Sequence, residues 1–397
     1  MEDELANKRG RVEPEPQEPP ANMDFISSLP DEMLVTIISH LPIKNGVRAT
    51  ILSRQWCPLW PTTPLDIIVD HEFCSGEQQR LDALSHVLAT HLGLVRRLAI
   101  GRLNPHNKIE PRLHYWFLSL ALDRLEELNL HARHPCSLPP SVLRLAPTLH
   151  RATFRRCIFP RIDVTRTLHL PKLKHLELIA IRIWKEDLER LLIGCTTLEY
   201  LRLHAMDGFS SLHITSTNVR AIYVHCWRRP WLLVEVFHDI VIENAPFLER
   251  LYVLDKLGPA RIRVIHAPKL IVLGYSCAEF NELVTGSLSI QKMIPTSLTR
   301  PLRIVKILAL QSVSPDLDEV VRFLRCFPGT EKLYIKILAG PKVNLTEITF
   351  NEYRCTTPEI KFARFFVEKA RLLKVMRFAL YLVHRSERIA KDAGVYS

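Results

Sequence analysis

One short apolar pattern recurs along the chain and constrains the fold more than any other feature. Each copy reads apolar-x-x-apolar-x-apolar, and successive copies begin 21 to 32 residues apart. The last two apolar residues of a copy are two positions apart, so they share one face of a short strand. The clear copies begin at Leu125, Leu173, Leu198, Val219, Leu248 and Leu270, and weaker copies begin at Val95, Leu149, Leu302 and Thr330.

A single unit of this kind cannot bury its apolar face, whereas stacked units can. Most of the spacings match those of leucine-rich repeats. We therefore predict an α/β fold in which residues 65–300 form an irregular leucine-rich-repeat solenoid with a parallel sheet on its concave side. The convex side should return as helices or irregular turns. One such helix is predicted at 185–195, where Leu188, Leu191 and Leu192 form one apolar stripe.

Prolines stand shortly before five of these strands, in the segments APTL, LPKL, APFL, APKL and FPGT. Proline fixes φ and donates no hydrogen bond, so it suits a loop that leads into a strand. The alternative is a generic α/β protein with accidental alternation. The number of near-regular copies and their shared prolines argue against it, although the repeat lacks an asparagine ladder.

The segment from Leu29 to Trp60 has a different texture and predicts about three small helices. Pro30 suits a first helical turn, and the acidic residues after it suit the positive end of the helix dipole. Apolar residues then recur at helical spacing up to Leu41, and Trp56 and Trp60 end the segment. A unit of this size rarely folds on its own core. Its apolar surface must be covered by a partner or by the first repeat.

The run DFISSLPDEMLVTIISHLPIKNGVRATILSRQWCPLW resembles an F-box, in its Leu-Pro-Asp-Glu start, its second Leu-Pro and its closing Leu-Trp. The whole chain resembles plant F-box proteins with leucine-rich repeats. The resemblance implies docking on a Skp1-like adaptor and, through it, on a cullin. Two positions depart from the usual pattern: Gly46 is a poor helix former, and Pro58 can shorten the third helix. The residues carried over as adaptor-binding are Leu29, Pro30, Leu41, Pro42, Val47, Leu52, Trp56 and Trp60.

Near the C-terminus, CFPGTEKLYIKI and EIKFARFFVEKARLLKVMRFAL are similar to the FBD domain that ends many such proteins. The expected domain organisation is a disordered arm at 1–23, an F-box at 24–64, the solenoid at 65–300, and an α+β FBD-like cap at 301–390. The arm is charged and rich in proline, with few apolar residues to offset the entropy of ordering.

Composition narrows the function. Nine scattered cysteines without a C-x-x-C pair argue against a disulfide framework or a zinc site and favour reduced, buried thiols. Phosphate-binding and catalytic motifs are missing from the sequence, so we predict no cofactor, no metal site and no enzymatic activity. No stretch has the length and apolarity of a membrane span, so no membrane partner is expected.

The predicted function is binding. The F-box would attach the chain to the adaptor of an SCF-type ubiquitin ligase, and the repeats would hold a target protein on the concave sheet. Glu177, Arg202, Tyr223 and Tyr252 are the candidate target-binding residues. The net charge of +11 predicts an acidic or phosphorylated target. The alternatives are a scaffold or decoy that acts outside a ligase and a basic solenoid that binds nucleic acid. The expected location is the cytoplasm, the nucleus or both.

Overall fold

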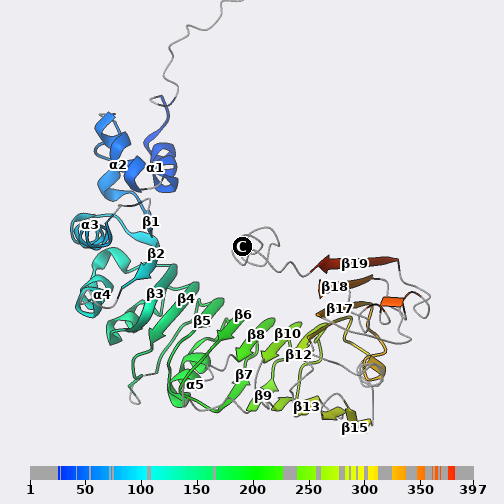
Figure 1. Cartoon of the computed structure of the whole chain (residues 1–397). Coiled ribbons are helices and arrows are strands. Elements are labelled where there is room, and N and C mark those ends of the chain that lie inside the picture. The colour runs from blue at the N-terminus through cyan, green and yellow to red at the C-terminus, as the bar shows by residue number, and fades with distance from the viewer. Residues whose placement is uncertain are drawn as a thin grey trace, which may run out of the picture.

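The fold was obtained as a computed structural model, and an open arc of stacked strands dominates it (Figure 1). The structure describes residues 26, 28–41, 43–52, 55–70, 73, 76–104, 109–163, 167–226, 239–255, 261–276, 282–285, 288–291, 294–298, 303–311, 324–336, 347–353, 360, 363–364, 367 and 374–380. The predicted arm at 1–23 therefore lies outside the described residues.

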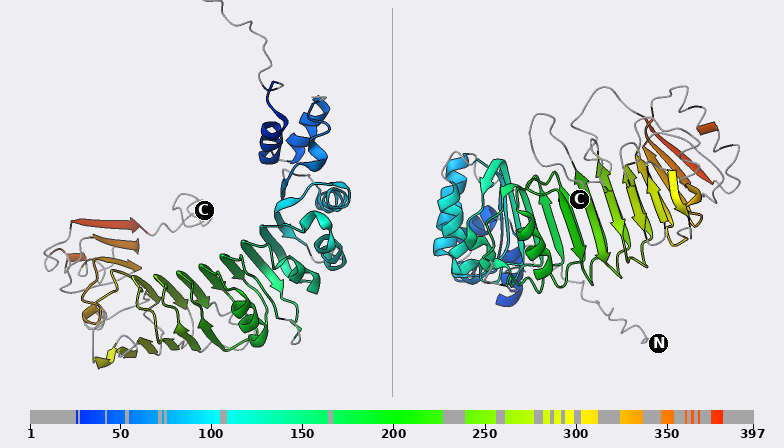
Figure 2. Two further views of the ribbon diagram at one scale, coloured as in Figure 1. Left: turned by 180° about the vertical axis from the view of Figure 1, so that it is seen from behind. Right: turned by 90° about the horizontal axis from the view of Figure 1, so that it is seen from below.

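The concave side of the arc is a 13-stranded sheet in which every neighbouring pair is parallel. Figure 2 shows these strands side by side along the arc. In spatial order they are β1 (Leu65–Val69), β2 (Val95–Leu103), β3 (Glu127–Ser137), β4 (Arg151–Ile158), β5 (His175–Ile179), β6 (Tyr200–His204), β8 (Ala221–Cys226), β10 (Arg250–Asp255), β12 (Val272–Ser276), β16 (Ile307–Gln311), β17 (Lys332–Lys336), β18 (Glu347–Tyr353) and β19 (Val375–Leu380). The predicted parallel sheet is confirmed.

Turns that lead into the strands explain the recurring prolines. The amide of Leu173 donates to the carbonyl of Leu170 at 3.3 Å, with Pro171 at the second position of the turn. The turns that contain Pro246, Pro268 and Pro328 close in the same way. The fixed φ of proline suits this position of a β-turn. The residue that closes each turn is the first residue of the repeat pattern and is buried; these residues are Leu173, Leu248, Leu270 and Thr330.

The strands end at a repeated backbone feature. Arg102, Arg156, Ala180 and Ala205 have φ values of 57°, 56°, 53° and 51°, and each stands seven residues after the start of its repeat. The left-handed region is uncommon for residues other than glycine. The residue that follows turns inward to the core in three of these repeats, as Leu103, Cys157 and Ile181. The missing asparagines are thus replaced by buried apolar side chains and thiols.

The convex side changes along the chain. Near the N-terminus it carries α3 (Glu77–Thr90), α4 (Ile109–Leu118), the short 3₁₀ helices η3 (Leu120–Leu122) and η4 (Pro140–Leu145), and α5 (Lys185–Gly194). The predicted helix at 185–195 is confirmed. Further on, the sequence pattern missed a second sheet, which runs β15-β14-β13-β11-β9-β7. Its strands are β7 (Ser211–Thr215), β9 (Asp239–Asn244), β11 (Arg261–Val264), β13 (Glu282–Thr285), β14 (Leu288–Gln291) and β15 (Ile294–Leu298).

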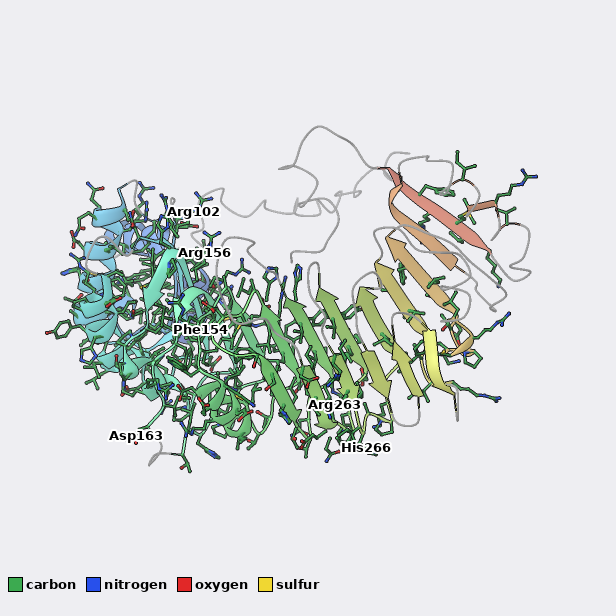
Figure 3. All side chains as sticks on the ribbon, turned by 60° about the horizontal axis from the view of Figure 1, so that its bottom comes forward. Arg102, Phe154, Arg156, Asp163, Arg263 and His266 are labelled. Carbon is green, nitrogen blue, oxygen red and sulfur yellow. The ribbon has the colours of Figure 1, made fainter. Side chains whose placement is uncertain are left out.

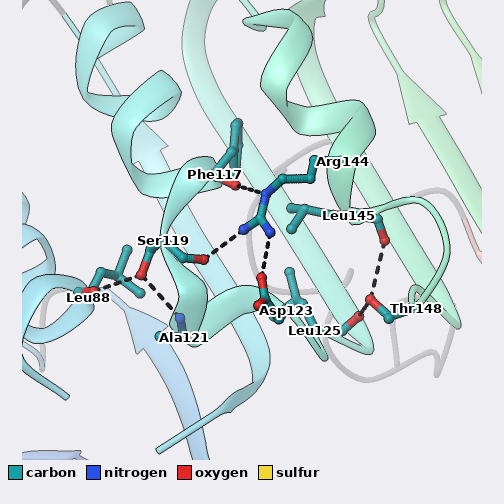
Figure 4. A network of polar contacts seen from close by, with 9 residues as sticks. All are labelled: Leu88, Phe117, Ser119, Ala121, Asp123, Leu125, Arg144, Leu145 and Thr148. Atoms are coloured by element: carbon teal, nitrogen blue, oxygen red, sulfur yellow. Dashed lines mark hydrogen bonds and ion pairs between the residues drawn. The ribbon is translucent and has the colours of Figure 1, made fainter. Parts of the chain in front are cut away.

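Polar side chains join neighbouring helical returns (Figure 4). Arg144 of η4 donates to the carbonyls of Phe117 at 2.9 Å and Ser119 at 2.7 Å, and it pairs with Asp123. Ser119 in turn donates to the carbonyl of Leu88 at 2.7 Å. The last carbonyls of a helix lack partners within the helix. In this network, side chains of the next repeat donate hydrogen bonds to those carbonyls and so link successive repeats.

Two N-terminal helices precede the arc, and Ile43 of the second one belongs to the apolar core of the arc. They are α1 (Asp31–His40) and α2 (Ile43–Leu52), and both pack on β1. The predicted third helix is wrong in its detail: residues 55–59 form turns, and only Trp60–Thr62 form a 3₁₀ helix, η1. Pro58 accounts for the difference, because proline removes an amide donor and clashes with the preceding helical turn.

The last repeats correct the predicted register. The copy placed at Leu302 begins instead at Val305, since β16 starts at Ile307 and the side chains of Val305 and Leu308 are buried. The strands β17–β19 extend the concave sheet without a break at residue 300. Two of them follow unrecognised copies of the pattern, LTEITF from Leu345 and LKVMRF from Leu373. Much of the predicted cap at 301–390 lies outside the described residues, so the domain limits stay predictions.

Candidate functional site

The N-terminal helical unit (α1, α2 and η1) is fixed to the first repeat through Trp60. The Trp60 ring packs against the core and meets the His91 ring edge to face, with centroids 6.0 Å apart. A Cβ atom added at Gly46 would lie 2.1 Å from Cζ3 of Trp60. Gly46 is a poor helix former, but because it has no side chain the indole can approach α2. His91 also contacts the carbonyl of Thr63 at 2.9 Å, which completes the junction.

Exposed apolar side chains lie on both helices of the same unit. Met33 and Ile37 are 55% and 38% exposed, and they stand four residues apart on one face of α1. Leu34 and Ile38, on the inner face, are fully buried. Val47 of α2 is 41% exposed and Ile26 is 52% exposed. Sequence reasoning missed Met33 and Ile37 as surface residues, because helical spacing alone does not tell which of two adjacent apolar stripes faces the core.

The predicted adaptor-binding residues differ in exposure where the structure describes them. Val47 and Pro30 are exposed, whereas Leu29, Leu41 and Trp56 are half-buried. Trp60 faces the solenoid as part of the junction. Pro42 lies outside the described residues, as does the side chain of Leu52, whose backbone ends α2. Their role in binding an adaptor stays a prediction, but the Trp60 ring is used inside the chain.

The four predicted target-binding residues lie in one row across the concave sheet. Glu177 of β5 registers with Arg202 of β6, Arg202 with Tyr223 of β8, and Tyr223 with Tyr252 of β10. All four are half-buried where their burial is described. Arg202 and Glu177 form an ion pair at 3.7 Å between Nη1 and Oε2. Parallel strands in register place equivalent side chains beside one another, so the alternating pattern was sufficient to predict this row.

Aromatic rings stack along this part of the sheet. The Tyr223 and Tyr252 rings lie parallel, with centroids 4.6 Å apart and an interplanar angle of 8°. Tyr200 adds to the stack at 5.1 Å from Tyr223. On the next strand, a Cβ at Gly274 would lie 2.2 Å from Cδ1 of Tyr252, so glycine leaves room for that ring. Burial raises the pKa of the Tyr200 and Tyr252 phenols, which therefore stay neutral hydrogen-bonding groups.

A second concave row holds histidines and an arginine near the ends of the strands. His131 of β3 registers with Arg155 of β4, and His204 of β6 registers with His225 of β8. The rings of the last pair lie 4.4 Å apart. Burial, followed by nearby arginines, lowers the pKa of His131 and His204 below the usual 6.5. These imidazoles are therefore neutral near pH 7 and sit in a positive field.

Other kinds of site find no support in the described part of the chain. No group of three or more His, Cys, Asp or Glu residues there could hold a metal ion. Among the cysteines whose side chains are described, Cys136, Cys157, Cys195 and Cys326 are buried, and Cys57 is exposed. Burial raises the pKa of the Cys136 and Cys195 thiols to about 11 and about 12. None of the described helices has the length and apolarity needed to cross a bilayer.

Known proteins share this repeat array. The family described as "FBD-associated F-box protein At5g56370, LRR repeats" matches residues 113–335. F-box/FBD/LRR-repeat protein At1g13570 of Arabidopsis thaliana is 27% identical over 232 residues, which are 57% of this chain and 52% of the relative. FBD-associated F-box protein At4g10400 is 27% identical over 253 residues, 58% of this chain and 61% of the relative.

F-box protein At4g09920 of the same plant is 31% identical over 257 residues, which cover 58% of this chain and 80% of the relative. Against the other two relatives, the chain spans between half and two thirds of their length. The family match covers more than half of the chain and falls on β3 to β17 of the concave sheet. This protein therefore belongs to the plant family of FBD-associated F-box proteins with leucine-rich repeats.

Proposed function

We propose that the chain is the target-recognition subunit of an SCF-type ubiquitin ligase. The N-terminal helical unit docks on a Skp1-like adaptor and, through it, joins a cullin. The concave sheet holds a target protein. The chain carries out no chemistry itself; it supplies proximity and orientation for ubiquitin transfer by other subunits.

The exposed apolar face of α1 and α2 is the observation that carries this proposal. Met33, Ile37 and Val47 remain in contact with solvent although the helical unit packs firmly on β1 through its other face. Apolar side chains grouped on a small helical unit and surrounded by polar residues are typical of a protein interface. The membership of the family gives the partner its expected identity, because an F-box is the adaptor-docking element of such proteins.

The adaptor test uses the full chain. A Met33→Asp, Ile37→Asp double variant should lose a recombinant Skp1-like adaptor in co-purification, because two charges would be desolvated at the interface. The matched control is Ile193→Asp, which changes an exposed residue of α5 on the convex side (76% exposed). Trp60 is less suitable, since its removal also disturbs the core. Equal recovery of the adaptor with the double variant and the control would refute docking through this face.

A cullin measurement separates the ligase from the alternative, a scaffold or decoy that occupies the adaptor without acting in a ligase. Both readings predict adaptor binding, but only the first predicts that cullin is recovered with the adaptor and that a bound target becomes ubiquitinated in a reconstituted reaction. Adaptor without cullin would support the decoy.

A further inference from the structure

Three arginines lie near one histidine in the later parts of β2, β3 and β4, the concave strands that follow β1. Leu103 registers with Ala132, which places Arg102 beside His131, and His131 registers with Arg155 on its other side. Arg156 follows Arg155 directly. Burial lowers the pKa of His131 most, and the charges of Arg155, Arg156 and Arg102 lower it further. We call Arg102, Arg155, Arg156 and His131 the arginine rim. Figure 3 shows Arg102 and Arg156 along the same edge of the sheet, opposite Asp163 and His266.

The positive charge of this rim is not balanced within the described chain. None of its three guanidinium groups forms an ion pair with a described carboxylate, and the buried Nε of Arg155 has no hydrogen-bond partner among the described residues. Arginines on nearby strands are neutralised: Arg97 pairs with Glu127 at 3.2 Å, and Arg220 pairs with Glu249 at 2.7 Å. Arg102 and Arg156 are exposed, and Nη1 of Arg156 donates to the carbonyl of Arg133 at 3.0 Å. An incoming anion would give the buried Nε of Arg155 an acceptor and would pair with the exposed guanidinium groups.

The backbone at the rim is also unusual. Arg102 and Arg156 both occupy the left-handed region, with φ values of 57° and 56°. The equivalent positions of the next two repeats hold small residues, Ala180 and Ala205. The left-handed position thus belongs to the repeat, and among the described residues it carries an arginine on β2 and on β4, with β3 between them. The repeated backbone geometry therefore places both cations along one edge of the sheet.

We propose that the arginine rim binds the phosphoryl group of a phosphorylated segment of the target protein. Guanidinium groups recognise phosphate through paired, charge-assisted hydrogen bonds, and the rim offers three of them within one site. The inference rests on the proposed role of the concave face in holding a target. It adds the chemical class of that target and the residues that read it.

The aromatic stack adds a spacing rule. In the sheet, β4 is followed by β5, β6 and β8, so three steps between strands separate Arg155 from Tyr223. At about 4.8 Å a step the sideways span is about 14 Å, and because Arg155 registers through Ile179 and His204 with His225, two residues beyond Tyr223, the direct span is about 16 Å. An extended peptide advances about 3.3 Å per residue and covers that distance in about five residues. A segment that crosses the sheet would therefore carry its phosphate at the rim and, about five residues away, a proline or aromatic side chain on the Tyr200–Tyr223–Tyr252 stack.

The test measures fluorescence anisotropy with the purified full-length chain. The probes are a peptide library with one fixed phosphoserine and degenerate flanks, the same library with serine, and a single-stranded 20-nucleotide DNA. We expect the phosphoserine library to bind at least about tenfold more tightly than the serine library, as charged hydrogen bonds contribute that much. Enrichment and sequencing of the bound peptides should recover proline or aromatic residues about five positions from the phosphoserine.

The variants separate the rim from net charge. Arg155→Gln, Arg156→Gln should weaken phosphopeptide binding about tenfold or more. The control Arg97→Gln, Arg220→Gln removes the same number of charges from ion-paired positions and should leave binding almost unchanged. Arg102→Gln alone, which leaves β4 intact, guards against a folding defect in the double variant; circular dichroism checks all of them.

Three outcomes would overturn the proposal: equal binding of the two peptide libraries, equal loss in the rim variant and the control, or tighter binding of DNA than of the phosphopeptides with a steep salt dependence. The last would assign the rim to nucleic acid. If the chain binds the adaptor but does not prefer phosphopeptides, only the rim proposal is contradicted. If the chain does not bind the adaptor but does prefer phosphopeptides, the proposed ligase function is contradicted and the rim proposal is not.

Discussion

The two halves of the arc close their repeats in different ways. Between β2 and β6, the chain returns along the convex side mainly as helices and 3₁₀ turns, while from β6 onwards it returns as the strands β7, β9 and β11. Repeat length accounts for part of the change. The repeats that begin at Leu198 and Leu248 are 21 and 22 residues long, whereas the one that begins at Val95 has 30. A strand covers a given distance in fewer than half the residues that a helix needs.

The difference also sets curvature. Packed helices are about 8–10 Å apart, whereas paired strands are about 4.8 Å apart. A solenoid with helices outside and strands inside must bend, and one with strands on both sides has little reason to. In Figure 1 the sheet turns sharply beside α3 and α4 and runs almost straight from β6 to β12. The arginine rim lies in the bent part, and the tyrosine stack lies in the straight part.

The largest expected effect comes from the helical half. Phe117 of α4 is fully buried, and Phe117→Ala should lower the free energy of unfolding by about 3–5 kcal/mol. Urea unfolding followed by circular dichroism at 222 nm would measure it. If the halves unfold as one unit, the transition should stay single. A change below about 1 kcal/mol would mean that the helical return contributes little to the core.

The matched change in the strand half is Ile240→Ala, at a fully buried position of β9. Deleting a buried isoleucine side chain costs about 2–5 kcal/mol. The free energy of unfolding should therefore fall by an amount similar to, or smaller than, that for Phe117→Ala. If Ile240→Ala lowered the urea midpoint of the circular-dichroism signal from strands but not that of the helical signal at 222 nm, the two halves would be separate folding units. The comparison would then be one of two domains.

Gly46 tests the junction between the helical unit and the arc. Helix propensity alone predicts that Gly46→Ala stabilises the chain by about 1 kcal/mol. The clash with the Trp60 ring predicts the opposite, a loss of about 1–3 kcal/mol, because the indole cannot move without disturbing the core. Thermal unfolding of Gly46→Ala, with and without Trp60→Leu, separates these cases. A gain in stability with Trp60 in place would contradict the packing described here.

Arg144 tests the polar links between neighbouring helical returns. Arg144→Met keeps most of the apolar stem and removes the bonds to Phe117, Ser119 and Asp123. We expect a loss of about 1–2 kcal/mol in urea unfolding, because the group is partly solvated and water can replace some of the bonds. Arg220→Met, which removes an exposed pair with Glu249, is the control and should change stability by less than about 1 kcal/mol.

The smallest effect concerns pH. The pKa values of His91, His131, His175 and His204 lie below the usual 6.5, chiefly through burial. The unfolded chain therefore takes up protons first as the pH falls through 6.5, and protonation favours the unfolded state. Urea midpoints should be highest above that pH and should decrease down to the lower folded values. His175→Asn should reduce the slope, and a midpoint that rises on mild acidification would contradict the assignment.

Sequence periodicity was sufficient for the concave side. The pattern placed β3, β5, β6, β8, β10 and β12 and brought Glu177, Arg202, Tyr223 and Tyr252 into one row, because each repeat has a fixed start and an alternating strand. It failed where the signal is weak. At β16 two apolar residues, Leu302 and Val305, compete for the first position of the repeat, and only packing decides between them.

The remaining features depend on contacts between distant segments. The second sheet was missed because short returns such as SLHIT and RIRV carry only two buried residues each. The arginine rim follows from no local pattern, since Arg102 joins Arg155 and Arg156 through the register of β2 on β3. The packing of Trp60 on Gly46 likewise joins residues whose contact no local pattern predicts.

The indole of Trp60 lies between α2 and the first repeat, so any rotation of the helical unit against the arc would have to break this contact. If the joint holds, each position along the arc has a fixed distance and direction from the far face of α1. With that face clamped in a ligase, a segment held at the bent end and one held at the straight end would be presented at different reaches. The position of the target on the concave sheet would then determine which of its lysines can be ubiquitinated.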